Sequence, residues 1–463
     1  MKISLKNLGP LKDAEFELGD FTIICGDNNN GKTYATYGLY GFLTYWREAF
    51  RLDISSARMD ELFRMGTTLI SINEYTQKAD EIISRGCAAY KEQLSVVFSS
   101  PKKRFEESMF QVSIDSKRDI NLIEPFELTL GAAKSQLFTI KKEANDPNVS
   151  ITLLVSTQKL KIPKQIVVRT IADALKDILF GHLFPRPFIA SAERTGAAIF
   201  RKELNFPKRK MLEELHKSDE VDPYDLVFNI SNDYALPVEA NVKFARSLES
   251  LFKKTSFITK QHKGLLDEFS DIIGGNYEVT KNDELHYIQK KGKIKLTLDE
   301  SSSAVRSLLD IGFYLRHQAE PGDILMIDEP ELNLHPSNQR KVARLLAKLV
   351  NIGIKVFVTT HSDYIIKEIN TLLLLNDNQP HLAVIKEREK YSDKELLKPA
   401  QIRLYMAKEG PRLLDGNKNK TKCQTLIPAN INLDEGGIEV STFDDTIDEM
   451  NRIQDEIIWG GEA

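Results

Sequence analysis

Several features that define common protein classes are scarce in this sequence. Its three cysteines, Cys25, Cys87 and Cys423, are widely separated among 463 residues, which excludes a disulfide framework and a Cys-x-x-Cys zinc site. No apolar run approaches the roughly 20 residues needed to span a bilayer, and residues 1–5 open as a strand without a signal-peptide pattern. A net charge of −4 gives no overall signature of nucleic-acid binding. We expect a cytoplasmic protein without membrane contact.

The composition is that of a soluble globular protein, with 41% hydrophobic and 28% charged residues, and the length suggests about three domains. We expect residues 1–50 and 275–380 to form the two parts of one nucleotide-binding head. Residues 51–274 are expected to form an insertion that is mainly helical with some strands. A C-terminal extension, 381–463, begins where the sequence turns first basic and then acidic.

The central motif is a loop bounded by glycines, Gly26–Thr33, which follows the apolar run 21–25 and precedes a helical pattern that extends to about residue 50. This order of strand, loop and helix is the context of the phosphate-binding loop G-x-x-x-x-G-K-[ST]. Glycines let successive N–H groups point at phosphate oxygens, and the helix N-terminus adds partial positive charge. A chance glycine-rich turn is the alternative. We expect ATP to be held by Asn28, Asn29, Asn30, Gly31, Lys32 and Thr33, with the Thr33 hydroxyl on Mg²⁺.

Two further apolar runs end in chemically active residues. The run 324–327 ends in Asp328 and Glu329, as a buried parallel strand would if it delivered carboxylates to the edge of a sheet. Asp328 can hold Mg²⁺ directly or through water, and Glu329 can orient the water that attacks the γ-phosphate. The run 355–360 ends at His361, which is either a sensor of the γ-phosphate or a buried structural histidine. The sequence therefore predicts an ATPase.

Taken together, the phosphate loop, a serine-rich turn at 301–303, the segment 327–336 and the segment 359–362 resemble the ATP-binding cassette (ABC) heads of the SMC, RecF and OLD group. The resemblance implies an α/β P-loop NTPase head of the ABC type, with a mixed sheet flanked by helices. It also implies head-to-head dimers in which Ser302, Ser303 and Arg306 approach the γ-phosphate bound by the other protomer. Ala304 stands where this family usually has glycine, which implies weaker ATP-driven dimerisation and slow turnover.

A narrower resemblance concerns Glu193-Arg194-Thr195-Gly196 and the tail 437–444, which are similar to OLD-type ATPases of bacterial anti-phage systems such as PARIS and Septu. It implies a separate effector, such as a Toprim-like or HNH nuclease, that the ATPase holds or releases in response to a phage protein or DNA. Only about 100 residues follow His361, and Asp444-Asp445 has no apolar strand before it. We therefore expect no nuclease site in this chain.

Other interpretations remain open at this point. Glu193 and Arg194 follow a predicted strand, where they either reach phosphate or a partner strand or form a surface ion pair. Apolar residues near the C-terminus fit one face of a last helix, which docks either on its own domain or on a partner. The protein itself is alternatively a RecF- or SMC-like DNA-repair ATPase that binds DNA directly, or a transporter subunit. The long insertion without sustained heptads argues against a coiled-coil arm.

Overall fold

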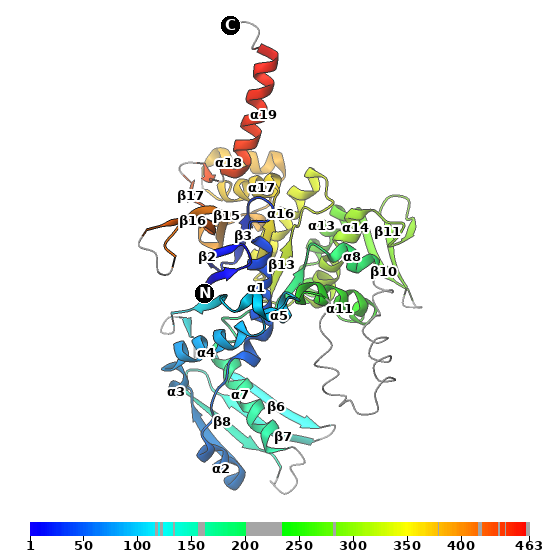
Figure 1. The fold of residues 1–463 in the computed structure, drawn as a ribbon. Coiled ribbons are helices and arrows are strands. Elements are labelled where there is room, and N and C mark those ends of the chain that lie inside the picture. Colours follow the sequence, from blue (N-terminus) through cyan, green and yellow to red (C-terminus); the bar gives the residue numbers. More distant parts are fainter. Residues whose placement is uncertain are drawn as a thin grey trace, which may run out of the picture.

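A six-stranded sheet organises the molecule (Figure 1). The computed structural model describes residues 1–115, 119–120, 124–132, 135–155, 163–200, 234–280, 284–377, 379–414, 419–433, 436–439 and 441–459. In spatial order the sheet comprises β16 (Thr421–Pro428), β15 (Ile402–Arg412), β3 (Phe21–Cys25), β14 (Lys355–Thr360), β13 (Ile324–Asp328) and β9 (Pro187–Ala190). Only β16 pairs antiparallel with its neighbour; the other neighbouring pairs of this sheet are parallel. The carboxyl ends of β3, β13 and β14 therefore meet at one edge.

Helices cover both faces of this sheet, and alternating side chains of its strands point into two cores. Helix α1 (Lys32–Ala49) packs on one face together with Ile24 of β3 and Met326 of β13. Helices α16 (Pro336–Asn351) and α17 (Asp363–Leu374) cover the other face, where Leu325 and Ile327 point. Burial on both faces explains why these strands are continuous apolar runs. The predicted fold class, an α/β P-loop head of the ABC type with a mixed sheet between helices, is confirmed.

A second, antiparallel sheet lies beside the phosphate loop. Its order is β2 (Leu11–Glu17), β1 (Lys2–Leu8) and β5 (Met109–Ser113). The hydroxyl of Tyr405 on β15 accepts a hydrogen bond from the Glu17 amide at 2.8 Å, and the Thr425 hydroxyl of β16 donates to the Asp13 carbonyl. The β15–β16 hairpin is thereby fixed to the N-terminal strands.

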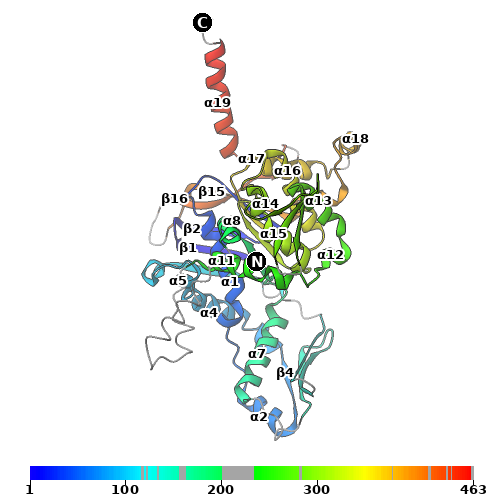
Figure 2. The ribbon, with the colours of Figure 1, turned by 90° about the vertical axis from the view of Figure 1, so that its right-hand side faces the viewer.

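The insertion combines helices with a sheet of its own (Figures 1 and 2). Its helices include α2 (Ser56–Met65), α4 (Ala79–Lys91) and α7 (Lys164–Phe180), and its antiparallel sheet has the order β4 (Thr67–Ser71), β8 (Asn148–Leu153), β7 (Ser135–Lys142) and β6 (Phe126–Ala132). Figure 1 shows α2, α7, β6, β7 and β8 projecting below the rest of the molecule.

The boundaries predicted from the sequence divide strands that belong to one sheet. β9 falls within the predicted insertion 51–274, and β15 and β16 fall within the predicted extension 381–463, yet all three pair in the sheet that contains β3. The physical reason is that parallel neighbours require long crossover connections, so strands of one sheet are spread widely along the sequence. The insertion returns to the head at β9, and the head extends to β16.

After β16, the chain forms the short pair β17 (Ile431–Asn432) and β18 (Gly437–Ile438), which Asn370 of α17 holds by hydrogen bonds to Gly436 and Ile438. The last helix, α19 (Ser441–Trp459), stands away from the body in both views (Figures 1 and 2). Its Ile457 is 77% exposed. The described part of α19 therefore does not dock on its own domain. Within the described residues, no helix combines the length and apolar character of a membrane span.

Candidate functional site

The loop between β3 and α1 has the backbone conformation that its glycines permit. Gly26 has a φ of +131° and Gly31 a φ of +91°, values that side chains rarely adopt. A Cβ at Gly26 would lie 2.6 Å from the Ala407 carbonyl oxygen, and one at Gly31 would lie 2.6 Å from Leu11 Cγ. Both positions therefore require glycine, for conformation and for space.

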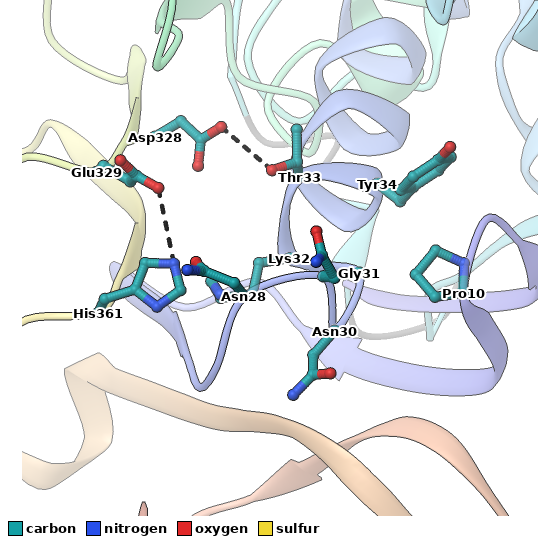
Figure 3. Close-up of a pocket in the computed structure, with 11 residues that line it drawn as sticks. Pro10, Asn28, Asn30, Gly31, Lys32, Thr33, Tyr34, Asp328, Glu329 and His361 are labelled. Atoms are coloured by element: carbon teal, nitrogen blue, oxygen red, sulfur yellow. Dashed lines mark hydrogen bonds and ion pairs between the residues drawn. The ribbon is translucent and has the colours of Figure 1, made fainter. Parts of the chain in front are cut away.

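A cavity of about 600 Å³ lies over this loop. It brings together every predicted loop residue, both predicted carboxylates and the predicted histidine, although they come from three separate strand ends (Figure 3). Its lining residues are Pro10, Asn28, Asn29, Asn30, Gly31, Lys32, Thr33, Tyr34, Asp328, Glu329 and His361.

Lys32 supplies a positive charge at the base of the cavity. Its side chain is largely buried, at 6% exposure, and its Nζ donates to the carbonyls of Gly26 at 2.8 Å and Asp27 at 2.7 Å. Burial lowers the pKa of this ammonium, whereas the charges of Asp328 and Glu329 act to raise it. Because Lys32 holds the loop's own carbonyls, it fixes the loop while it faces the cavity.

Thr33 and Asp328 place two oxygen ligands next to each other. The Thr33 hydroxyl donates to Asp328 Oδ2 at 3.4 Å (Figure 3). The Thr359 hydroxyl donates to Oδ1 of the same carboxylate. Burial raises the pKa of Asp328, and the bond from Thr359 opposes this shift. A hydroxyl beside a carboxylate fits Mg²⁺, which binds oxygen ligands and usually keeps waters and substrate phosphates as its other partners. The donor set therefore fits the predicted metal.

Glu329 is held in an unusual backbone conformation. Its φ is +54°, in the left-handed region that is sparsely populated by residues other than glycine. Its amide donates to the Thr359 carbonyl at 3.0 Å, and its Oε1 lies 3.6 Å from His361 Nε2. Burial, with a contribution from the Lys32 charge, lowers the pKa of His361 and so favours the neutral ring. A carboxylate and a neutral imidazole thus face each other across the cavity.

Glu331 is a supporting residue that the sequence analysis did not select. Its Oε1 accepts a hydrogen bond from the His361 amide at 2.6 Å, and burial raises the pKa of this carboxyl. It therefore fixes the turn that presents His361. The only signal in the sequence was its place in the acidic segment that follows β13.

The β15–β16 hairpin also reaches the phosphate loop. The Asn30 side chain donates to the Ala407 carbonyl at 3.1 Å and accepts a hydrogen bond from Gln424 at 3.0 Å. No local pattern indicated these contacts, because they join residues almost 400 positions apart.

The predicted signature residues lie outside this cavity. Ser302 caps helix α14 (Ser303–Ser307) by accepting a hydrogen bond from the Val305 amide, and the serines at 302 and 303 are exposed. Arg306 Nη1 donates to the carbonyls of Leu298, Asp299 and Ser301. The action of Ser302, Ser303 and Arg306 on a nucleotide bound by a second protomer stays a prediction.

The structure excludes both interpretations of Arg194. Its side chain is buried, does not line the cavity and makes hydrogen bonds to backbone carbonyls, so it neither reaches toward phosphate nor forms a surface ion pair. Glu193 is exposed, and its Oε2 accepts a hydrogen bond from the Tyr37 hydroxyl at 3.0 Å.

Comparison with known proteins adds a family. Two solved structures are similar over nearly the whole chain: the SMC head bound to the C-terminal winged-helix domain of ScpA, at 12% identity and a TM-score of 0.34, and the SMC head domain from Thermotoga maritima, at 10% identity and a TM-score of 0.30. The first match covers 94% of this chain and 98% of the other, and the second covers 93% and 98%. No curated protein matches significantly. Residues 1–366 match the family described as the AAA ATPase domain, and the chain therefore belongs to that family.

Proposed function

We propose that this ATPase is a slow sensor and scaffold that controls a separate effector in anti-phage defence. The observation that carries the ATPase part is the convergence of Lys32, Thr33, Asp328, Glu329 and His361 in one cavity. Each of these side chains has the chemistry that its place requires: a cation for phosphate, two oxygens for Mg²⁺, a carboxylate for water and a neutral imidazole for a phosphate oxygen.

The proposed hydrolysis divides the work among these residues. The loop N–H groups and Lys32 bind the phosphates. The loop is already in position for this, because Lys32 holds its carbonyls. Thr33 and Asp328 would hold Mg²⁺, which neutralises developing charge on the phosphate oxygens. Glu329 orients the attacking water and accepts its proton. His361 donates a hydrogen bond to the γ-phosphate while Glu331 fixes its backbone.

We further propose that two copies associate head to head around ATP. Ser302 and Ser303 are exposed residues that lie outside their own cavity, where a second copy can reach them. Ala304 replaces the glycine expected between them and Arg306, and its side chain takes up space where the phosphate would approach the backbone. Weak dimerisation and slow turnover follow from that extra methyl group.

The role in defence rests on the resemblance of the segment 193–196 to OLD-type ATPases and on the exposed helix α19. Met450, Ile453 and Ile457 are exposed on α19, and acidic residues dominate the sequence around them. This combination suits a basic partner protein with an apolar groove, and a Toprim-like or HNH nuclease is the proposed effector. A phage protein or DNA is the proposed trigger, and the cytoplasm is the proposed compartment.

Two substitutions test the ATPase assignment. Lys32→Ala removes a charge-assisted contact to phosphate and should abolish binding of a fluorescent ATP analogue. Glu329→Gln should stop phosphate release, retain ATP and increase the dimer fraction in light scattering. Lys243→Ala serves as the matched control, because this exposed lysine does not line the cavity and pairs with Glu239 on its own helix. Unchanged nucleotide affinity in Lys32→Ala would refute the assignment.

The proposed role in defence has a separate test. The product of the adjacent gene is copurified with this protein in the presence and absence of ATP, and cells that carry both genes are challenged with phage. We expect a stable complex and protection that Lys32→Ala abolishes. A neighbouring repair gene, DNA binding without a protein partner and normal phage growth would instead indicate the DNA-repair alternative.

A further inference from the structure

Arg194 is a buried arginine that serves three segments of the chain at once. Its side chain is 1% exposed. It makes four hydrogen bonds, and all of the acceptors are backbone carbonyl oxygens. The acceptors and distances are Ser191 at 2.8 Å, Ser307 at 2.7 Å, Asp328 at 2.6 Å and Glu329 at 2.8 Å.

These carbonyls belong to functionally distinct elements. Asp328 ends the strand β13, Glu329 follows it, and both carry carboxylates of the cavity, whereas Ser307 ends α14, the helix of the predicted signature. Arg194 itself begins helix α8 (Arg194–Ile199), just after β9. One rigid guanidinium, whose donors form a fixed fork, therefore ties the carboxylate-bearing strand to the signature helix.

The contact also explains how Glu329 keeps its unfavourable backbone conformation. A residue other than glycine keeps a φ of +54° only if neighbouring groups hold both its backbone amide and its backbone carbonyl. The Glu329 amide is fixed by the Thr359 carbonyl, and its carbonyl accepts hydrogen bonds from Arg194 at 2.8 Å and from the Leu332 amide at 3.1 Å. Without Arg194, only the local turn bond from Leu332 would hold this carbonyl, and we expect the Glu329 backbone and carboxylate to shift.

Arg194 stands behind the carboxylates and not among the residues that face the nucleotide, because it does not line the cavity. Its positive charge is close enough to interact with Asp310, Asp328, Glu329 and Glu331. It therefore offsets part of the repulsion between acidic groups that are crowded at the end of β13.

We infer that Arg194 is a positioning residue for hydrolysis: it fixes the Glu329 carboxylate against the attacking water and links it to the signature helix. This inference rests on the proposed function, in which Glu329 orients that water. It assigns Arg194 no contact with ATP, so nucleotide binding should not depend on it.

The same two strands provide a matched control. Arg186, at the other end of β9, forms a two-pronged pair with Asp323 just before β13, with Nε–Oδ1 at 2.8 Å and Nη2–Oδ2 at 2.7 Å. Arg186 and Arg194 thus both join β9 to β13, but only Arg194 lies at the end that carries the site. Arg186→Lys should lower the stability of the fold without displacing the carboxylates of Asp328 and Glu329.

The test compares Arg194→Lys, Arg194→Gln, Arg186→Lys and Glu329→Gln in the full-length protein. Melting temperature, affinity for a fluorescent ATP analogue, KM and kcat are measured for each. For Arg194→Lys we expect kcat to fall about 100-fold, the scale of a misplacement of about 1 Å, while nucleotide affinity changes less than about threefold. Arg186→Lys should lower the melting temperature about as much as Arg194→Lys does, but it should keep the wild-type kcat.

The outcomes separate the two proposals. If Glu329→Gln stops turnover but both Arg194 variants keep kcat within about twofold of Arg186→Lys, Arg194 is only structural and the inference fails while the proposed function stands. If Glu329→Gln turns over normally, the proposed function itself fails. Because Arg194→Gln removes a buried charge and tests folding as well as positioning, Arg194→Lys decides the kinetic comparison, and its crystal structure with an ATP analogue must show Glu329 displaced. An unmoved Glu329 in that structure overturns the inference.

Discussion

Asp310 is a buried acid whose neutralisation should stabilise the protein at alkaline pH. It lies on α15 (Leu309–Phe313), is 1% exposed, and neither of its carboxylate oxygens has a hydrogen-bond partner among the described residues. Burial raises its pKa from 3.8 to about 7, although the Arg194 charge opposes this shift. We predict that Asp310→Asn increases the free energy of unfolding at pH 8 and has little effect near pH 4.

The sign follows from the protons bound in each state. In the unfolded chain the Asp310 carboxyl loses its proton near pH 3.8, whereas in the folded protein it keeps the proton up to about pH 7. Between these values the folded state binds more protons, so its stability falls as the pH rises and stays low above pH 7. One pKa unit corresponds to about 1.4 kcal/mol, so the upper limit of the gain for a neutral, isosteric asparagine is about 4 kcal/mol at pH 8.

Urea unfolding of the nucleotide-free protein at pH 8 and pH 4, followed by circular dichroism, measures this effect. Asp299→Asn is the control, because Asp299 is exposed and a surface substitution of this kind should change stability by less than about 0.5 kcal/mol. If Asp310→Asn is instead less stable than wild type at pH 8, the attraction between Asp310 and Arg194 outweighs desolvation. The description of Asp310 as a neutral acid would then be wrong.

Three further substitutions follow from contacts in the structure. Thr33→Ala should raise the Mg²⁺ concentration for half-maximal phosphate release at least about tenfold, and an unchanged Mg²⁺ dependence would contradict a ligand role for the hydroxyl. Gly26→Ala should abolish nucleotide binding in equilibrium titrations, because its methyl group would meet a β15 carbonyl at 2.6 Å; wild-type affinity would show that the loop tolerates a side chain. Glu395→Gln should lower the urea-derived unfolding free energy by about 3 kcal/mol, since Glu395 is fully buried against Arg344 at 2.6 Å. The exposed control Glu409→Gln should cost less than about 1 kcal/mol, and equal losses would refute the comparison.

The central residues of the site could be predicted because each has a local signal. The phosphate loop, Asp328-Glu329 and His361 all follow apolar runs, and parallel strands bring their carboxyl ends to one edge of a sheet. Local patterns were therefore enough to place Lys32, Asp328 and His361 around one cavity, although they are far apart in sequence.

The remaining features lacked such signals. β9 has only four residues, too few to show a period, so its place in the head sheet depends on its pairing with β13. The bond from Asn30 to the Ala407 carbonyl and the four bonds of Arg194 end on backbone acceptors, which every residue possesses. The type of the acceptor residue therefore gives no signal in the sequence, and these partners are seen only in the folded chain.

The arrangement of charge around the cavity explains why phosphate binding and metal binding should depend on each other. Asp328 and Glu329 line the cavity beside the single ammonium of Lys32, and Glu331 lies two residues further along. A triphosphate added to these carboxylates would meet net repulsion in a partly desolvated space, where charge interactions are stronger than in water. Arg194 offsets this repulsion only from behind the strand, because it does not line the cavity. Asp328 and Thr33 would hold a divalent cation that offsets this repulsion, so we expect ATP to bind far more weakly in a chelator than in Mg²⁺.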